Sequence, residues 1–194
     1  MSPASPWLAR WAHLIAPGGA VLDLAAGSGR HTLWLARRGH RVTAVDRDAA
    51  ALQPLAGCAE IVVADLEGAP WPLVGRRFDA VVVTNYLWRP LWPAITAALA
   101  PGGVLLCETF AAGNESVGRP ARPDFLLAPG ELLGAAAGLR IVAYEDGFLS
   151  VPDRFVQRIA AVRAHPGAAP VRHPLEAGAA RPGSVESPGS EINP

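Results

Sequence analysis

Strand-like and helix-like segments alternate five times within the first 110 residues, and this alternation constrains the fold more than any other feature. The strand-like segments are 20–25, 40–46, 60–65, 78–85 and 101–110. Several are almost continuously apolar, as in "FDAVVVT", which is typical of strands covered by helices on both faces of a parallel sheet. The alternation therefore predicts a doubly wound α/β sheet.

The remaining segments complete one expected domain, residues 1–164. An amphipathic helix is predicted within residues 1–17, with Ser5 as its N-cap and Pro6 at its first position. Further helices are expected at 32–38, 49–55, 88–99 and 131–137. Two late strands, 140–145 and 153–162, lie close enough along the chain to form an antiparallel pair, after a long irregular loop at 111–130. Residues 165–194 are rich in Pro, Gly and Ala without apolar periodicity, and are predicted to be disordered.

Polar residues stand at or near the ends of five successive predicted strands. They are Asp23, Asp46, Asp65, Asn85 and Glu108. Ligands of doubly wound sheets bind outside the carboxyl ends of the strands, so these side chains are expected to share one site.

The glycine turn in "VLDLAAGSGRH" indicates which ligand that site takes. A dinucleotide fingerprint starting at Gly27 would continue to Gly29 and then meet Thr32 in place of the third glycine. A carboxylate such as Asp23, about 4 Å from a phosphate, would cost roughly 4 kcal/mol at an effective dielectric near 20. A cationic, hydroxyl-rich ligand such as S-adenosylmethionine reverses that sign. Asp23 would then receive the ammonium, Asp46 the ribose hydroxyls and Asp65 the adenine amine.

Five segments carry a resemblance to a known family. "VLDLAAGSG", "VTAVDRD", "IVVADLEG", "FDAVVVTNYL" and "LAPGGVLLCETF" resemble, in order and spacing, the signature segments of class I S-adenosylmethionine-dependent methyltransferases. The similarity runs from about residue 18 to 163, and its later part also resembles small bacterial methyltransferases of the tellurite-resistance type. It implies a Rossmann-like sheet of seven strands, mostly parallel, with an antiparallel last strand.

The resemblance implies cofactor contacts at the glycine loop and at successive strand ends. The expected cofactor-binding residues are Asp23, Ala25, Gly27, Gly29, Asp46, Arg47, Asp65, Leu66 and Asn85. Ala25 departs from the glycine usual in the family, and its methyl group is expected to be tolerable if the backbone keeps a negative φ. Structural alternatives remain open: Asp46 as a helix cap (a role Asp48 could fill instead), Asp23 as a buried acid holding a loop amide, Asp65 as a turn residue and Asn85 as a strand-end cap.

Candidate catalytic and acceptor-binding residues lie on the same edge of the predicted sheet. Glu108 is the expected general base, and Tyr86 is a second catalytic candidate. The candidate substrate contacts are His31, Trp88, Arg89, Phe110, Asn114 and Arg119. Core packing is the alternative for the aromatic residues, and a solvated helix start is the alternative for Arg30 and His31. In the long loop, Asn114, Arg119, Arg122 and Asp124 are expected to form a lid, with the arginines available to clamp an anionic acceptor.

The predicted function is methyl transfer from S-adenosylmethionine to a small acceptor by in-line displacement, achieved mainly by positioning. A non-catalytic cofactor-binding module and, less favoured, an NAD-dependent oxidoreductase are the alternatives. The chain contains no Lys, which excludes mechanisms that need a lysine Schiff base or a P-loop lysine.

Composition bears on partners and location. Seventeen Arg balance seventeen acidic residues, so nucleic acid is not an expected partner. No apolar run approaches the roughly 20 residues of a membrane helix, and no signal-peptide pattern opens the chain. Two distant cysteines, Cys58 and Cys107, lack metal-ligand spacing and are expected to be buried and reduced, as in a cytoplasmic protein. No metal is expected, and the oligomeric state is left open.

Overall fold

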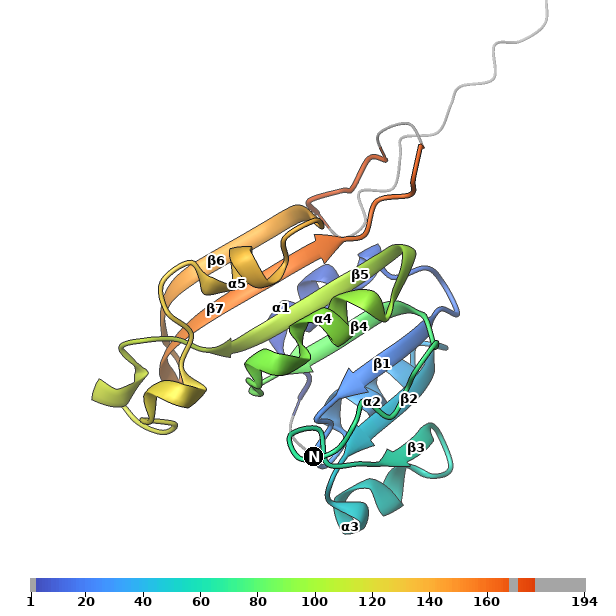
Figure 1. The fold of residues 1–194 in the computed structure, drawn as a ribbon, viewed down its shortest axis with the longest axis horizontal. Coiled ribbons are helices and arrows are strands. Elements are labelled where there is room, and N and C mark those ends of the chain that lie inside the picture. Colours follow the sequence, from blue (N-terminus) through green and yellow to red (C-terminus); the bar gives the residue numbers. More distant parts are fainter. Residues whose placement is uncertain (1–2, 168–170, 177–194) are drawn as a thin grey trace, which may run out of the picture.

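A seven-stranded mixed sheet forms the centre of the computed structural model, which describes residues 3–167 and 171–176. The strands are β1 (Ala20–Leu24), β2 (Arg41–Asp46), β3 (Glu60–Val63), β4 (Phe78–Thr84), β5 (Leu99–Phe110), β6 (Arg140–Ser150) and β7 (Asp153–Val162), in the order β3-β2-β1-β4-β5-β7-β6 (Figure 1). Pairing is parallel from β3 through β5, and β7 is antiparallel to both β5 and β6. The predicted doubly wound sheet with an antiparallel last strand is confirmed.

Helices cover both faces of this sheet (Figure 1). They are α1 (Pro6–Trp11), α2 (Arg30–Ala36), α3 (Ala49–Leu52), α4 (Trp92–Ala97) and α5 (Glu131–Ala135). Alternate strand residues point to opposite faces, because the side-chain period of a strand is two. Leu22, Val81 and Leu105 therefore pack in one core with residues of α4 and α5. Val21 and Val82 pack in a second core with residues of α1 and α2.

The N-terminal helix forms where its cap and apolar spacing predict it. Ser5 Oγ accepts a hydrogen bond from Trp7 N (3.1 Å), and Pro6 occupies the first helical position. Trp7, Leu8 and Trp11 are buried in the second core. This helix therefore closes one face of the sheet.

Several predicted boundaries shift. The helix expected at 32–38 is Arg30–Ala36, and the one expected at 49–55 ends at Leu52 and continues as the 3₁₀ turn Gln53–Leu55. The helix expected from residue 88 begins as the 3₁₀ turn Arg89–Leu91 and becomes α-helical only at Trp92. Pro90 and Pro93 explain this late start, because proline lacks the N–H that a helix interior requires.

The predicted disordered tail falls partly outside the described residues, which exclude 168–170 and 177–194. Residues 171–176 form neither helix nor strand, but they pack against the domain. The ring nitrogen His13 Nε2 lies 3.0 Å from Pro174 O. This short segment thus contacts a distant helix end, and disorder of the tail as a whole stays a prediction.

Candidate functional site

The turn between β1 and α2 brings backbone to the carboxyl edge of the sheet. Ala25, Gly27 and Gly29 all have positive φ, of 54°, 54° and 73°. A Cβ on Gly29 would lie 2.2 Å from Leu55 Cδ1, so only glycine fits between the turn and Leu55. Gly29 thus has a packing role as well as a conformational one.

Ala25 corrects an expectation. Its φ is positive, whereas a negative φ was the condition under which its methyl group was expected to be tolerable. A left-handed alanine costs roughly 1–2 kcal/mol because Cβ crowds the carbonyl oxygen. The loop therefore carries backbone strain at a residue that lines a cavity.

Asp46, the last residue of β2, holds the glycine turn from across the edge. Its Oδ2 accepts a hydrogen bond from Gly27 N (2.8 Å), and its Oδ1 accepts one from Asp48 N (3.0 Å). The N-cap of α3 is Asp48, whose Oδ1 accepts from Ala50 N and Ala51 N. The helix-cap role considered for Asp46 therefore belongs to Asp48.

A cavity of about 270 Å³ opens where β1, β2, β3 and β4 end, and we name it the Asp46 cavity. It is lined by Ala25, Asp46, Arg47, Ala64, Asp65, Leu66, Glu67 and Tyr86. Five residues predicted to bind a cofactor meet here. Ala64 and Glu67 were not predicted, although they flank Asp65 and Leu66 directly in the sequence.

Asp65 is both a turn residue and a wall of this cavity. Its Oδ1 accepts a hydrogen bond from Glu67 N (3.0 Å). Hydrogen bonds from the backbone N–H groups of Glu67 and Gly68 hold the pKa of Asp65 below its usual value. Asp65 therefore presents an ionised carboxylate to the cavity at neutral pH.

A second cavity of about 340 Å³, which we name the Phe110 cavity, adjoins the first. It is lined by Glu67, Asn85, Tyr86, Leu87, Thr109, Phe110, Pro120 and Phe125. Glu67 and Tyr86 line both cavities and so form the boundary between them. Four of these residues were not predicted. Leu87 and Thr109 directly neighbour the predicted Tyr86 and Phe110 in the sequence, whereas Pro120 and Phe125 come from the long loop, for which other residues were expected at the site.

Tyr86 is the most unusual side chain at this boundary. Its hydroxyl oxygen is buried and has no hydrogen-bond partner in the part of the chain that the structure describes. Burial, and then the carboxylates of Glu67 and Asp65, raise the pKa of Tyr86 well above its usual value. A buried hydroxyl without a partner is costly, and a ligand spanning the two cavities could supply the missing bond.

Asp23 lies deeper than the cavity walls. It is 1% exposed, and its Oδ2 accepts a hydrogen bond from Thr32 Oγ1 (2.6 Å). Burial raises the pKa of Asp23 to about 6, against the opposing effect of the bonds from Thr32. This arrangement corresponds to the alternative of a buried acid that holds the loop.

Glu108 does not line either cavity. Its carboxylate is 1% exposed, accepts a hydrogen bond from Ser5 Oγ (3.1 Å), and pairs with Arg154 and Arg158 at 3.4 Å each. The carboxylate is thus engaged in ion pairs inside the fold, away from both cavities. This placement supports a structural role for Glu108, and its role as a general base stays a prediction.

His31 joins the same N-terminal contact. Its Nε2 lies 3.2 Å from the donor Ser5 N, and the ring is buried. Burial, followed by the charge of Arg30, lowers the pKa of His31 to about 4. His31 does not line either cavity and is neutral at pH 7.

Of three other candidate substrate residues, two are bound to groups of the protein and one is exposed. Arg89 pairs with Glu131 at 2.7 Å and donates to the carbonyl oxygens of Asp124 and Leu126. Asn114 is buried, with Nδ2 donating to Pro120 O and Oδ1 accepting from Phe155 N. Trp88 is exposed and lines neither cavity.

The predicted clamp for an anionic acceptor is not assembled. Arg122 pairs with Asp124 at 2.9 Å, both exposed, and Arg119 is exposed and outside the cavity wall. Of the predicted substrate residues, Phe110 lines the second cavity. The loop nevertheless contributes to that cavity through Pro120 and Phe125.

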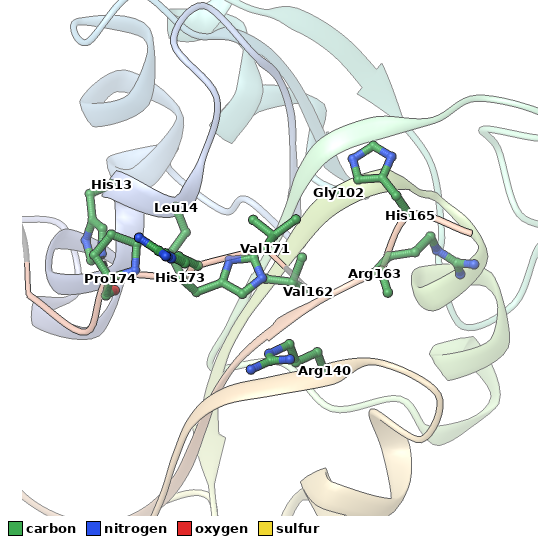
Figure 2. Close-up of a pocket in the computed structure, with 12 residues that line it drawn as sticks. His13, Leu14, Gly102, Arg140, Val162, Arg163, His165, Val171, His173 and Pro174 are labelled. Atoms are coloured by element: carbon green, nitrogen blue, oxygen red, sulfur yellow. Dashed lines mark hydrogen bonds between the residues drawn. The ribbon is translucent and has the colours of Figure 1, made fainter. Parts of the chain in front are cut away.

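A third cavity, of about 360 Å³, shares no residue with the other two. Figure 2 shows the residues that line it. Its polar lining consists mainly of basic side chains: His13, Arg140, Arg163, His165, Arg172 and His173. One wall is the packed segment that contains Val171 and Pro174. We name it the Arg140 cavity.

Three further findings concern metals, membranes and thiols. Among the described residues, no three His, Cys, Asp or Glu side chains are grouped so that they could hold a metal ion. No described helix is long and apolar enough to cross a membrane. Cys107 is buried but Cys58 is exposed, so the expectation of two buried thiols is wrong for Cys58.

Comparisons with known proteins agree with this architecture. Residues 21–103 match a family model described as a methyltransferase domain. TehB from Haemophilus influenzae has a similar fold, with a TM-score of 0.65 at 20% identity, covering 78% of this chain and 59% of TehB. This chain thus spans less than two thirds of the length of TehB.

Two further solved structures share the fold. An S-adenosylmethionine-dependent methyltransferase from Methanosarcina mazei matches with a TM-score of 0.65 at 16% identity, covering 84% of this chain and 99% of that one. The glycopeptide N-methyltransferase MtfA, solved with S-adenosyl-L-homocysteine, matches with a TM-score of 0.56 at 21% identity, covering 76% of this chain and 84% of that one. No curated protein sequence matches the chain.

Proposed function

We propose that this chain is a class I S-adenosylmethionine-dependent methyltransferase that transfers the methyl group of that cofactor to a small acceptor; the matched methyltransferase-domain model and the shared fold support this. One observation carries the proposal. A cavity lined by strand-end carboxylates and an apolar cavity meet at a common wall formed by Glu67 and Tyr86. Such a pair of adjoining cavities suits a reaction between a polar cofactor and a small second substrate.

The Asp46 cavity fits the polar groups of the cofactor. Each carboxylate oxygen of Asp46 accepts one backbone hydrogen bond, which leaves lone pairs for the two ribose hydroxyls. Asp65 offers an acceptor for the adenine amine, and the largely buried Leu66 offers an apolar surface for the ring. Ala25 and Gly27 would lie along the amino-acid part, with Asp23 acting through Thr32 to fix the loop.

Charge in this cavity favours a cation. Asp46, Asp65 and Glu67 line it, against the single guanidinium of Arg47. S-adenosylmethionine carries a sulfonium and an ammonium, and its phosphate-free structure avoids repulsion by these acids. The same acids disfavour the pyrophosphate of a nicotinamide dinucleotide.

The bound cofactor supplies a methyl group already activated by the positive sulfur. The protein therefore has to hold the acceptor atom in line and exclude water, and positioning of this kind can supply about 7–11 kcal/mol. Tyr86, at the boundary of the two cavities, is placed to orient the acceptor with its neutral hydroxyl. It acts there as a hydrogen-bonding group, because its raised pKa keeps the proton on the oxygen.

Calorimetric titration with S-adenosylhomocysteine tests the cofactor site. Asp46→Ala should weaken binding at least roughly tenfold, because it removes two charge-assisted hydrogen bonds to the ribose. Asp48→Ala is the matched control. It removes the cap of α3, at a stability cost of about 1 kcal/mol, and should leave the affinity unchanged. Equal affinities for wild type and Asp46→Ala would refute the assigned contact.

A further inference from the structure

We propose that the acceptor is a small apolar amine that occupies the Phe110 cavity and, in its neutral form, is methylated there on nitrogen. This inference rests on the proposed function and names the substrate class of the same site. It follows from the shape, the charge and the proton-transfer capacity of the cavity wall.

The wall of the Phe110 cavity is mainly apolar. Tyr86, Phe110 and Phe125 contribute aromatic rings, and Leu87 and Pro120 contribute aliphatic surface. The volume of about 340 Å³ is near the lower end of the range for small-molecule sites. A molecule with one or two rings matches both the size and the lining.

The charge of this wall excludes anions. Glu67 is the one lining residue with a full charge at neutral pH, and no arginine or histidine lines the cavity. The acids Asp65 and Asp46 stand in the adjoining cavity. An oxyanion would enter a site of like charge, whereas a nitrogen that becomes positive during methyl transfer is stabilised there.

Of the three arginines closest to the cavity in the sequence, Arg119 is exposed and does not line it, and the other two are engaged elsewhere. The guanidinium of Arg89 is bound to Glu131 and two carbonyl oxygens, and that of Arg122 is paired with Asp124. Basic side chains instead line the separate Arg140 cavity (Figure 2).

The proton balance favours an amine over a phenol. A phenol must lose its proton before it attacks. Tyr86, with its raised pKa, stays protonated, and the other ionisable group of the wall, the carboxylate of Glu67, belongs to a class of base much weaker than a phenolate. A neutral amine attacks with its own lone pair. The N–C bond forms as the S–C bond breaks, and the electron pair of the broken bond passes to sulfur. The methylammonium product lies beside Glu67 and releases one proton to water.

The test uses the full chain and two probe amines, benzylamine and tryptamine, with phenol, benzoate and selenite for comparison. Binding to protein saturated with S-adenosylhomocysteine is measured by calorimetry, and turnover by cofactor-dependent product formation. We expect both amines to bind and at least one to be methylated, with kcat/KM rising with pH as the neutral fraction of the amine rises. Binding or turnover of selenite or phenol in preference to the amines overturns the proposal, as does failure of both amines to bind.

Two variants separate this proposal from the proposed function. Phe125→Ala, in the wall of the Phe110 cavity alone, should raise KM for the amine roughly tenfold and leave the affinity for S-adenosylhomocysteine unchanged. Phe148→Ala removes an exposed ring on β6 outside both cavities and should change neither quantity. Failure of the wild type to bind S-adenosylhomocysteine would refute the proposed function itself. If S-adenosylhomocysteine binds but Phe125→Ala leaves KM for the amine unchanged, only the proposed acceptor site is refuted.

Discussion

At the scale of single residues, Asp23 and His31 respond to burial in opposite ways. Burial raises the pKa of the Asp23 carboxyl to about 6, above its ordinary value of 3.8. Burial lowers the pKa of the His31 imidazole to about 4, below its ordinary value of 6.5. Both residues flank the glycine turn, so their protonation bears on the part of the molecule that positions the cofactor.

These two shifts act on stability with opposite signs. Between about pH 4 and 6 the folded protein binds more protons at Asp23 than the unfolded chain does, so the contribution of Asp23 falls as pH rises. At His31 the unfolded chain binds more protons between about pH 4 and 6.5, so its contribution rises with pH. Each residue changes the free energy of unfolding by about 3 kcal/mol across its pH range, and the two changes largely cancel in the wild type.

Single variants should reveal each contribution. Relative to wild type, Asp23→Asn should gain about 3 kcal/mol of unfolding free energy as pH rises from 4 to 6, because the carboxylate penalty is removed. His31→Gln, which keeps an acceptor for Ser5 N, should lose about 3 kcal/mol relative to wild type over pH 4 to 6.5. Urea denaturation at four or five pH values measures both. Variants that remain parallel to wild type across this range would contradict the assignment.

At the scale of elements, the turn from β1 to α2 is held in a strained shape by its neighbours. The Ala26 N–H donates to Val45 O on β2, and the Gly27 N–H donates to Asp46. These contacts with β2 fix the path of the turn, and Ala25 adopts its positive φ within it. The strain is thus imposed by packing between elements, since alanine disfavours that φ.

Relieving this strain should stabilise the protein. Ala25→Gly is expected to raise the free energy of unfolding by about 1 kcal/mol, because glycine adopts positive φ without steric cost. Ala26→Gly is the matched control and should lower it by about 0.5–1 kcal/mol, because its φ is not positive and glycine there only adds freedom to the unfolded chain. Urea unfolding of the three proteins decides the point. A loss of stability in Ala25→Gly would show that the methyl contact outweighs the backbone strain.

At the scale of the whole molecule, one buried ionic network joins distant parts of the chain. Glu108 on β5 meets Ser5 before α1 and the two arginines Arg154 and Arg158 on β7. Arg158 also pairs with Glu145 on β6. The N-terminal segment is thereby fixed to the centre and the antiparallel edge of the sheet. This network accounts for a buried carboxylate that the sequence alone suggested as a catalytic base.

Breaking this network should cost stability. Glu108→Gln is expected to lower the free energy of unfolding by about 3 kcal/mol, because it leaves the largely buried Arg154 without a counter-ion and removes one of the two carboxylates that pair with Arg158. Glu145→Gln, whose carboxylate is partly exposed, should cost under about 1 kcal/mol. Denaturation, together with the affinity for S-adenosylhomocysteine of the folded variants, checks the prediction. A Glu108→Gln protein of wild-type stability whose kcat has collapsed would support the general-base role instead.

The sequence by itself determined the order and type of the strands, the antiparallel last pair, the capped first helix and the polar strand ends. Each of these depends on local periodicity, capping or chain order, which neighbouring residues encode directly. Asp46, Asp65 and Leu66 could therefore be placed at one cavity, because parallel strands end at a common edge.

Tertiary structure alone decided which side chains at that edge reach a cavity. Glu108 pairs with two arginines that lie 46 and 50 residues away in the sequence, and Arg89 pairs with a glutamate 42 residues away. Phe125 lines the Phe110 cavity from a loop whose sequence has no periodic pattern. Contacts between residues so distant in the chain cannot be predicted from local sequence patterns. The free energy of an ion pair or of a packed ring depends on which groups the completed fold brings into contact.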